Sequence, residues 1–397
     1  MFGIGGDKTK EVSYGVVIDI GSGSVGIAIV KSNSKNKYGD IIWSLREWAP
    51  VHKTIDRTRL QNNLKTATFN CFLALENEGL KILQKTSPGA KIKTILASIS
   101  ALAAFTIYKS ITIEKDKPFL VTKKLIKKME EDAMTESVKM PEASQVETEM
   151  ALKAIANSTT LIKLNGYTVE DYENKKVQKV ELTHTSCLAH RELVEVIVEA
   201  KEKVLPAAKL HMQSFVTSYF QAIRSLTPVS RATFLDVTAE ATELSIVDEK
   251  EMIYTSHAPV GANFIARGVN AIIGTSFNES LGFMRDNQVN LTNRISPEKG
   301  AMLEGVKVNY ENKLTELLTG QDGKLDIPPT IYLHCDRNYE KFFQTRIEKI
   351  LSTNASKPTV FPVTSKFFPE SSIEDSGILL TAHVFHKKTY CEEEIVS

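Results

Sequence analysis

The stretch Tyr14–Lys31 reads YGVVIDIGSGSVGIAIVK. An apolar strand runs to Asp19, a turn of glycine and serine follows, and a second alternating strand leads away from the turn. A weaker version of this pattern lies at Thr233–Val247, TFLDVTAEATELSIV, with its aspartate at Asp236. Two hairpins, each with a carboxylate at its bend, predict two similar lobes that face a shared cleft.

Length and composition set the broad class. The chain has 397 residues, which is enough for two domains or more, and its 42% hydrophobic and 24% charged residues are ordinary for a globular protein. A formal charge of +1 gives no global field to attract nucleic acid. The four cysteines have no C-x-x-C spacing, which indicates reduced, structural thiols. We expect a cytoplasmic protein without a direct membrane anchor, because the ending HKKTYCEEEIVS has no amphipathic pattern.

The order of elements predicts how the lobes are built. Strands are expected at 16–20, 25–30, 40–44 and 94–100, with a helix at Leu60–Leu83 between the last two. A strand, a helix and two more strands are expected at 106–114, 123–135, 159–164 and 177–185. The predicted division is a flexible leader at 1–13, a first lobe from 14–104 with 189–227, an inserted subdomain at 105–188, a second lobe at 228–390 and a tail at 391–397.

The first turn has residue types that suit a phosphate. Gly21 and Gly23 allow backbone N–H groups to approach phosphate oxygens closely, and Ser22 and Ser24 add hydroxyl donors. Asp19 stands where a carboxylate could hold Mg²⁺ through water. Taken alone, this motif is weak evidence for a nucleotide site, because hairpins that contain D-x-G are common in proteins.

Four segments, in order, resemble the actin-like ATPase superfamily of actin, Hsp70 and the sugar kinases. Within it the chain is most similar to the bacterial cell-division protein FtsA and the type IV pilus assembly protein PilM. The segments are DIGSGSVGIAIV, LNGYTVEDYENKKVQKVELTHT, IYTSHAPVGANFIARGV after the second hairpin, and PPTIYLHCDRNYEKFFQTRIEKIL in place of the adenosine motif. The resemblance implies an α/β fold with two actin-like, ribonuclease H-like lobes and an inserted strand-helix-strand-strand subdomain of the SHS2 type.

The same resemblance implies ATP and Mg²⁺ as ligands, and it assigns roles to residues of this chain. Asp19 and Asp236 take the catalytic role and hold Mg²⁺ indirectly. The nucleotide-binding positions are Gly21, Ser22, Gly23, Ser24, Thr238, Ala239, Glu240, Gly261, His334, Cys335 and Asp336.

The departures from the family pattern concern the second half of this site. Relatives usually carry Asp-Ile-Gly-Gly-Gly-Thr-Thr-Asp at the second hairpin, whereas residues 236–243 read DVTAEATE, without glycine. Where a left-handed backbone is required, Thr238 and Ala239 would each cost about 1–2 kcal/mol. The segment from His334 to Asp336 likewise has bulky or charged side chains where relatives have glycines. We therefore expect weakened nucleotide binding or no cofactor, and ATPase activity that is weak or lost, with Glu240 as a guess for the base.

The leading hypothesis is a cytoplasmic scaffold that binds partner peptides and forms dimers or filaments. The resemblance implies an FtsZ-like protein, or the cytoplasmic tail of a pilus inner-membrane protein, as the partner, and recruitment to the inner face of the membrane through it. The sequence leaves open whether the system is division or pilus assembly. The alternatives are an active Mg-ATP-dependent ATPase or phosphotransferase with the same cleft, and a structural relic that binds nothing small.

Overall fold

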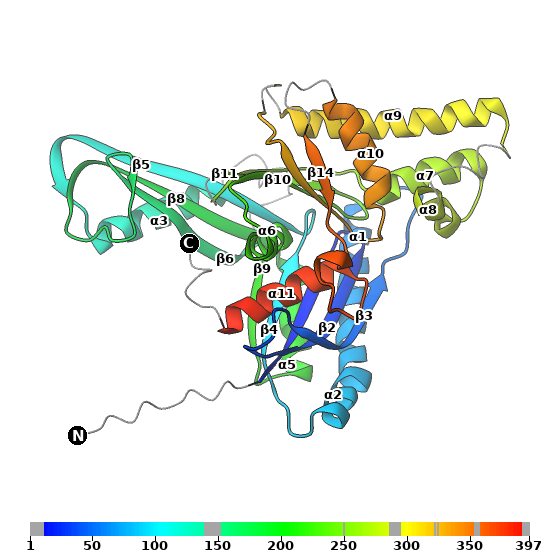
Figure 1. The fold of residues 1–397 in the computed structure, drawn as a ribbon, viewed down its shortest axis with the longest axis horizontal. Helices are drawn as coiled ribbons and strands as arrows, with labels where there is room; N and C mark the ends of the chain where they lie inside the picture. The colour runs from blue at the N-terminus through cyan, green and yellow to red at the C-terminus, as the bar shows by residue number, and fades with distance from the viewer. Residues whose placement is uncertain are drawn as a thin grey trace.

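The computed structural model describes residues 12–138, 152–248, 251–285, 295–320, 323, 325–352 and 358–390. These residues form three β-sheets with helices packed on their faces (Figure 1). Among them, no helix is both long and apolar enough to cross a membrane. The tail at 391–397 and most of the leader, 1–11, lie outside the described residues.

The first sheet holds the hairpin from which the sequence analysis starts. Its strands, in spatial order, are β3 (Asp40–Trp48), β2 (Ser24–Ser32), β1 (Ser13–Ile20), β4 (Ile92–Ile99) and β9 (Lys209–Ser214). Alternate residues of β1 enter different cores, because Val16 packs toward one face of the sheet and Val17 toward the other. This burial on both faces explains the continuous apolar run of β1.

Helices cover the outer face of this sheet. They are α1 (Arg57–Ala74) and α2 (Leu80–Thr86), joined by a π-helical turn at Leu75–Gly79, and α5 (Arg191–Val204). The single helix expected at Leu60–Leu83 is thus close to the observed element, which continues through the π turn. Asp56 begins α1 by accepting a hydrogen bond from the backbone N–H of Arg59.

The second sheet repeats the order of the first. Its strands are β12 (Glu251–Ala258), β11 (Thr242–Asp248), β10 (Arg231–Val237), β13 (Thr330–Cys335) and β14 (Thr359–Pro362). Its outer helices are α7 (Ala262–Ile273), α8 (Phe277–Arg285), α9 (Pro297–Thr319) and α10 (Glu340–Leu351). In each sheet an antiparallel hairpin is followed by a third strand on one side and two parallel strands on the other. The two similar lobes expected from the two hairpins are therefore confirmed.

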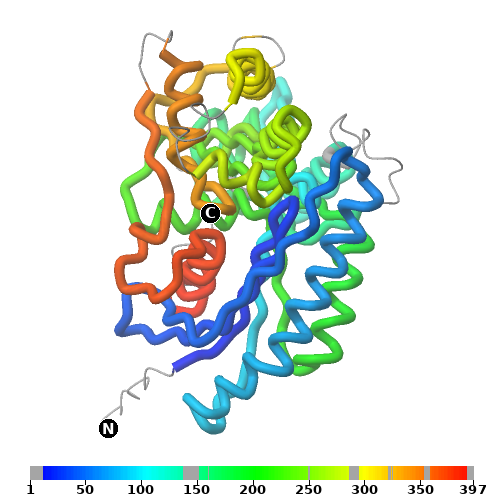
Figure 2. Tube along the Cα trace, turned by 90° about the vertical axis from the view of Figure 1, so that its right-hand side faces the viewer, coloured from blue at the N-terminus to red at the C-terminus, as the bar shows by residue number. Residues whose placement is uncertain are grey.

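Two helices lie between the five-stranded sheets. They are α6 (Phe215–Leu226) and α11 (Ser376–Tyr390), and both pack into a core that includes residues of β1 and β10. Figures 1 and 2 show α11 between the two sheets. Eleven consecutive residues at the start of α11, from Ser376 to His386, are buried. Because this part of α11 is buried on all sides, its apolar residues do not form a single apolar face.

The third sheet projects away from the other two in Figure 1. Its strands are β5 (Ala104–Leu120), β8 (Lys176–His190), β6 (Leu152–Leu164) and β7 (Tyr167–Thr168), and helix α3 (Lys123–Val138) packs on one face. Asn165 and Gly166 form the tight turn between β6 and β7, with φ of 50° and 86°. The Leu-Asn-Gly-Tyr motif is therefore a turn that needs a left-handed backbone, which asparagine and glycine adopt most readily.

Candidate functional site

The turns of the two hairpins touch each other. The hydroxyl of Ser22 lies 2.6 Å from the hydroxyl of Thr238, which itself donates to the carbonyl of Ala241. The Ser22 hydroxyl therefore donates to Thr238, and it accepts a hydrogen bond of 2.6 Å from the backbone N–H of Glu240. A phosphate cannot lie between Ser22 and Thr238 at these distances unless the two sheets move apart.

The glycines of the first turn are covered by side chains from the second half of the chain. A Cβ added at Gly21 would lie 2.6 Å from Oδ2 of Asp336, and one added at Gly23 would lie 2.4 Å from Cβ of Ala239. Among the described residues, non-glycine positive φ angles occur at Asn165, Asn174 and Asn338, so Thr238 and Ala239 are not strained as the sequence suggested they could be. The glycines here allow close approach of protein side chains.

Asp19 is engaged by an arginine. Its side chain, 2% exposed, forms an ion pair with the guanidinium of Arg46, on β3. The same guanidinium donates to both carboxylate oxygens of Asp375, at 2.6 and 2.8 Å, and to the Ser24 hydroxyl at 2.8 Å. Burial raises the pKa of Asp19, and Arg46 opposes that rise. Burial also acts to raise the pKa of Asp375, but Arg46, the backbone N–H of Ile378 and His334 together lower it. The Asp19 carboxylate, which the sequence analysis assigned to Mg²⁺, is thus paired with Arg46.

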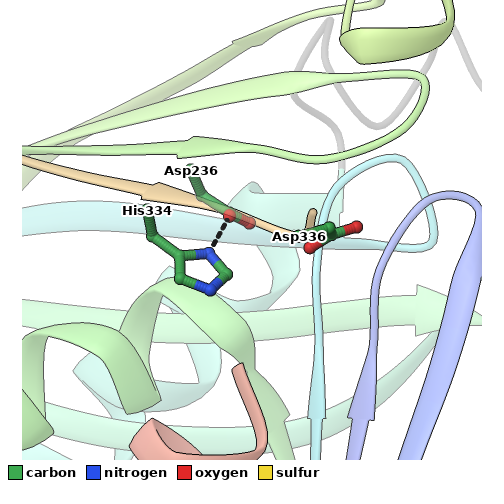
Figure 3. A group of neighbouring side chains, drawn as sticks. All are labelled: Asp236, His334 and Asp336. Atoms are coloured by element: carbon green, nitrogen blue, oxygen red, sulfur yellow. Dashed lines mark hydrogen bonds and ion pairs between the residues drawn. The ribbon is translucent and has the colours of Figure 1, made fainter. Parts of the chain in front are cut away.

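Asp236 is engaged by groups from both sheets. Its Oδ1 lies 2.7 Å from Nδ1 of His334 (Figure 3). Its Oδ2 accepts a hydrogen bond of 3.1 Å from the hydroxyl of Ser100. Burial alone would lower the pKa of His334, but the hydrogen bond and the charge of Asp236 raise it to about 9. Burial, together with the charge of Asp236, raises the pKa of Asp336 to about 7.

The remaining residues of the predicted site have structural partners. Glu240 pairs with Arg267 through both carboxylate oxygens, at 3.0 and 2.6 Å, and Asn263 donates to it at 2.8 Å, so its carboxylate is held as an ion pair. Gly261 lies against the backbone of the second turn, since a Cβ there would be 2.2 Å from the carbonyl oxygen of Thr238. Cys335 is buried, and burial raises the pKa of its thiol.

The structure thus brings the two turns, Asp236 and His334 together, whereas Cys335 lies in the hydrophobic core of the second lobe. A cavity of about 230 Å³ remains beside them, and it is lined by Arg46, Trp48, Arg285, Asp336, Arg337, Asn338, Glu374 and Asp375. Sequence reasoning missed Arg46 and Asp375, which are 329 positions apart. The only local signal was a charged residue on a strand next to the first hairpin.

No family model and no curated protein matches the chain. Among solved structures it is similar to PilM of the PilM–PilN type IV pilus biogenesis complex, at 12% identity, with 94% of this chain and 97% of that chain covered and a TM-score of 0.57. It is also similar to the ethanolamine utilization protein EutJ from Carboxydothermus hydrogenoformans (9% identity, 94% and 89% covered, TM-score 0.46). The double helical filament of MamK is a further match (8% identity, 94% and 98% covered, TM-score 0.45). At such identities the likeness shows the fold alone: the chain has the actin-like ATPase fold.

Proposed function

We propose that this protein is a scaffold of the FtsA and PilM type, which binds a partner peptide and holds its two lobes together with its own side chains. The contact between Ser22 and Thr238 is the observation on which this rests most, because it joins the turns that would have to separate around a triphosphate. Arg46 adds to it by bringing a fixed positive charge to Asp19. The likeness of the fold to PilM supports the class of protein.

In this proposal the nucleotide site is degenerate. Asp19 is paired with Arg46, Asp236 with His334, and the carboxylate of Glu240 with Arg267, so the residues present do not fit a bound Mg-ATP in this arrangement. A carboxylate that is already paired with a cation is a poor ligand for Mg²⁺ and a poor base. An active ATPase or phosphotransferase is therefore the less favoured reading, and ATP, if it binds, binds weakly.

The proposed division of the chain assigns the roles. Two actin-like lobes, 14–104 with 189–227 and 228–390, form the rigid body, and the subdomain at 105–188 supplies the surface for a partner or a second copy. The third sheet offers such a surface, because α3 covers one of its faces and the strands project from the rest of the molecule (Figure 1). The partner is the cytoplasmic tail of a pilus inner-membrane protein or an FtsZ-like protein. Binding to this partner recruits the protein to the inner face of the cell membrane.

A binding assay with purified protein tests this function. Synthetic peptides with the sequences of the pilus and division tails encoded in the same genome are titrated against the chain, with and without Mg-ATP. We expect one peptide to bind with an affinity that Mg-ATP changes by less than about twofold, which is about 0.4 kcal/mol. Binding that requires Mg-ATP, or steady ATP turnover that Asp236→Asn abolishes, would favour the enzyme instead.

A further inference from the structure

Asp236, His334 and Asp336 stand together at the ends of two neighbouring strands. In the parallel pairing of β10 with β13, Asp236 lies opposite His334. Asp336 is two residues after His334 in the sequence. Asp336 directly follows Cys335, the last residue of β13, and its carboxylate lies close to His334 and Asp236. Potential ligand atoms of the three residues lie within 4.8 Å of one another (Figure 3).

Two atoms of this group, Nε2 of His334 and Oδ2 of Asp336, are buried without a hydrogen-bond partner among the described residues. Oδ2 of Asp336 has no hydrogen bond among the residues that the structure describes, although the atom is inaccessible to solvent. It lies against the bare backbone of Gly21, where any other residue would displace it. A buried carboxylate oxygen is costly unless something pairs with it, so this atom indicates a ligand that is not part of the chain.

The surrounding charges favour a cation. Arg46 directs its N–H groups to Asp19, Asp375 and Ser24, so it does not supply the missing partner of Asp336. Four carboxylates, those of Asp19, Asp236, Asp336 and Asp375, stand close to the guanidinium of Arg46 and the imidazole of His334. The cavity beside them adds the carboxylate of Glu374 and the guanidinium groups of Arg285 and Arg337.

The group borders the cavity described above. Asp336 lines the cavity of about 230 Å³ whose other walls include Arg46, Trp48 and Asp375. Its side chain thus connects the cavity with the buried pair of Asp236 and His334, both 1% exposed. An ion that enters the cavity would therefore contact the Asp336 carboxylate before it reaches Asp236 and His334.

We propose that Asp236, His334 and Asp336 bind a divalent transition-metal ion, Zn²⁺ or Mn²⁺, in the absence of nucleotide. An imidazole nitrogen with two carboxylates suits these ions, whereas Mg²⁺ prefers oxygen ligands only. The hydrogen bond of 2.7 Å between Oδ1 of Asp236 and Nδ1 of His334 opens when the ion enters, and the proton that lies between these two atoms is released to solvent. This site does not use Asp19, and it is independent of the proposed scaffold function.

The test is a metal titration of the full chain after dialysis against a chelator and then chelator-free buffer. ZnCl₂, MnCl₂ and MgCl₂ are titrated separately by calorimetry, without nucleotide, and CoCl₂ is used as a visible-absorption probe of the ligand field. We expect one equivalent of Zn²⁺ or Mn²⁺ to bind, with Mg²⁺ at least tenfold weaker. Asp336→Asn and His334→Gln should each weaken binding by at least about tenfold.

Control variants make the outcome decisive. His211→Gln removes an exposed histidine on β9 and should leave metal affinity unchanged. Asp336→Asn should keep the fold, since its Oδ2 has no partner to lose, and circular dichroism with a melting curve verifies this. If neither Zn²⁺ nor Mn²⁺ binds, or if the ion that binds the parent chain binds the folded Asp336→Asn variant as tightly, the proposal is wrong.

Discussion

The hydroxyls of Ser22 and Thr238 lie 2.6 Å apart, although each belongs to the turn of a different hairpin in a different sheet. Both side chains are at most 2% exposed. In a cleft that opens for a nucleotide these two groups would face solvent or ligand. In this structure the two hydroxyls form a hydrogen bond with each other. The contribution of individual residues around this contact to stability and ligand binding can be measured by substitution.

Arg46 should be important for stability. Arg46→Ala leaves the buried Asp19 and the partly buried Asp375 without their cation, so we expect a loss of about 3–5 kcal/mol in the free energy of unfolding. Lys65→Ala is the matched control, because its pair with the exposed Glu192 should be worth less than about 1 kcal/mol. Urea denaturation of both variants decides the matter. Equal, small losses would show that Arg46 does not hold the cleft together.

Gly23 should tolerate no side chain while Ala239 stands opposite. Gly23→Ala places two methyl groups 2.4 Å apart, which should cost about 1–3 kcal/mol of stability through overpacking. Gly282→Ala, in helix α8 with open space around it, should instead be neutral or stabilising by about 0.5–1 kcal/mol.

A second substitution tests whether the contact with Ala239 is the cause. In the double variant Gly23→Ala, Ala239→Gly the methyl group moves from one turn to the other, and most of the lost stability should return. A double variant as unstable as Gly23→Ala alone would mean that the backbone of the first turn, and not the contact between turns, requires glycine.

His383 should make the protein sensitive to acid. Burial, with Lys387 and other cations nearby, lowers the pKa of His383 to about 3. An unfolded chain takes up this proton near pH 6.5, whereas the folded chain does not, so stability is intact above pH 6.5 and falls as the pH drops toward 3. The slope from this one group is at most about 1.4 kcal/mol per pH unit.

His383→Gln is the variant that checks this. It keeps a side-chain N–H near the Ser225 hydroxyl, which lies 2.6 Å from Nε2 of His383, but it does not titrate. Melting temperatures from pH 7 to pH 4 should therefore fall less steeply for the variant than for the parent chain. Parallel curves would show that His383 does not contribute to the acid sensitivity.

Much of the fold could be predicted because its signals are local. The run Val16–Ile20 is buried on both faces and leads into a glycine turn, so it identifies a central strand. Thr233–Val247 repeats the pattern of two strands around an aspartate, without the glycines. The strand β9 and the helix α6 were missed, as was β14, whose four residues end in a proline. Four of the six residues of Lys209–Ser214 are polar, and its pairing with β4 makes it a strand.

The contents of the cleft could not be predicted in the same way. The sequence indicated that the second hairpin lacks glycine, but it did not show which groups come near Asp19. Arg46 reaches Asp19 from a strand two places away in the sheet, and Asp375 reaches Arg46 from the start of α11. Contacts of this kind depend on how the sheets pack, which no local pattern in the chain reports.

Calorimetric titration of the chelator-treated chain with ATP and Mg²⁺ tests the central claim most directly. If the protein's own side chains hold the cleft closed, ATP should show no binding tighter than a dissociation constant of about 1 mM, which is about −4 kcal/mol. A micromolar dissociation constant, lost in Asp19→Asn, would contradict the account, because it would mean that the turns joined by Ser22 and Thr238 separate readily around a nucleotide.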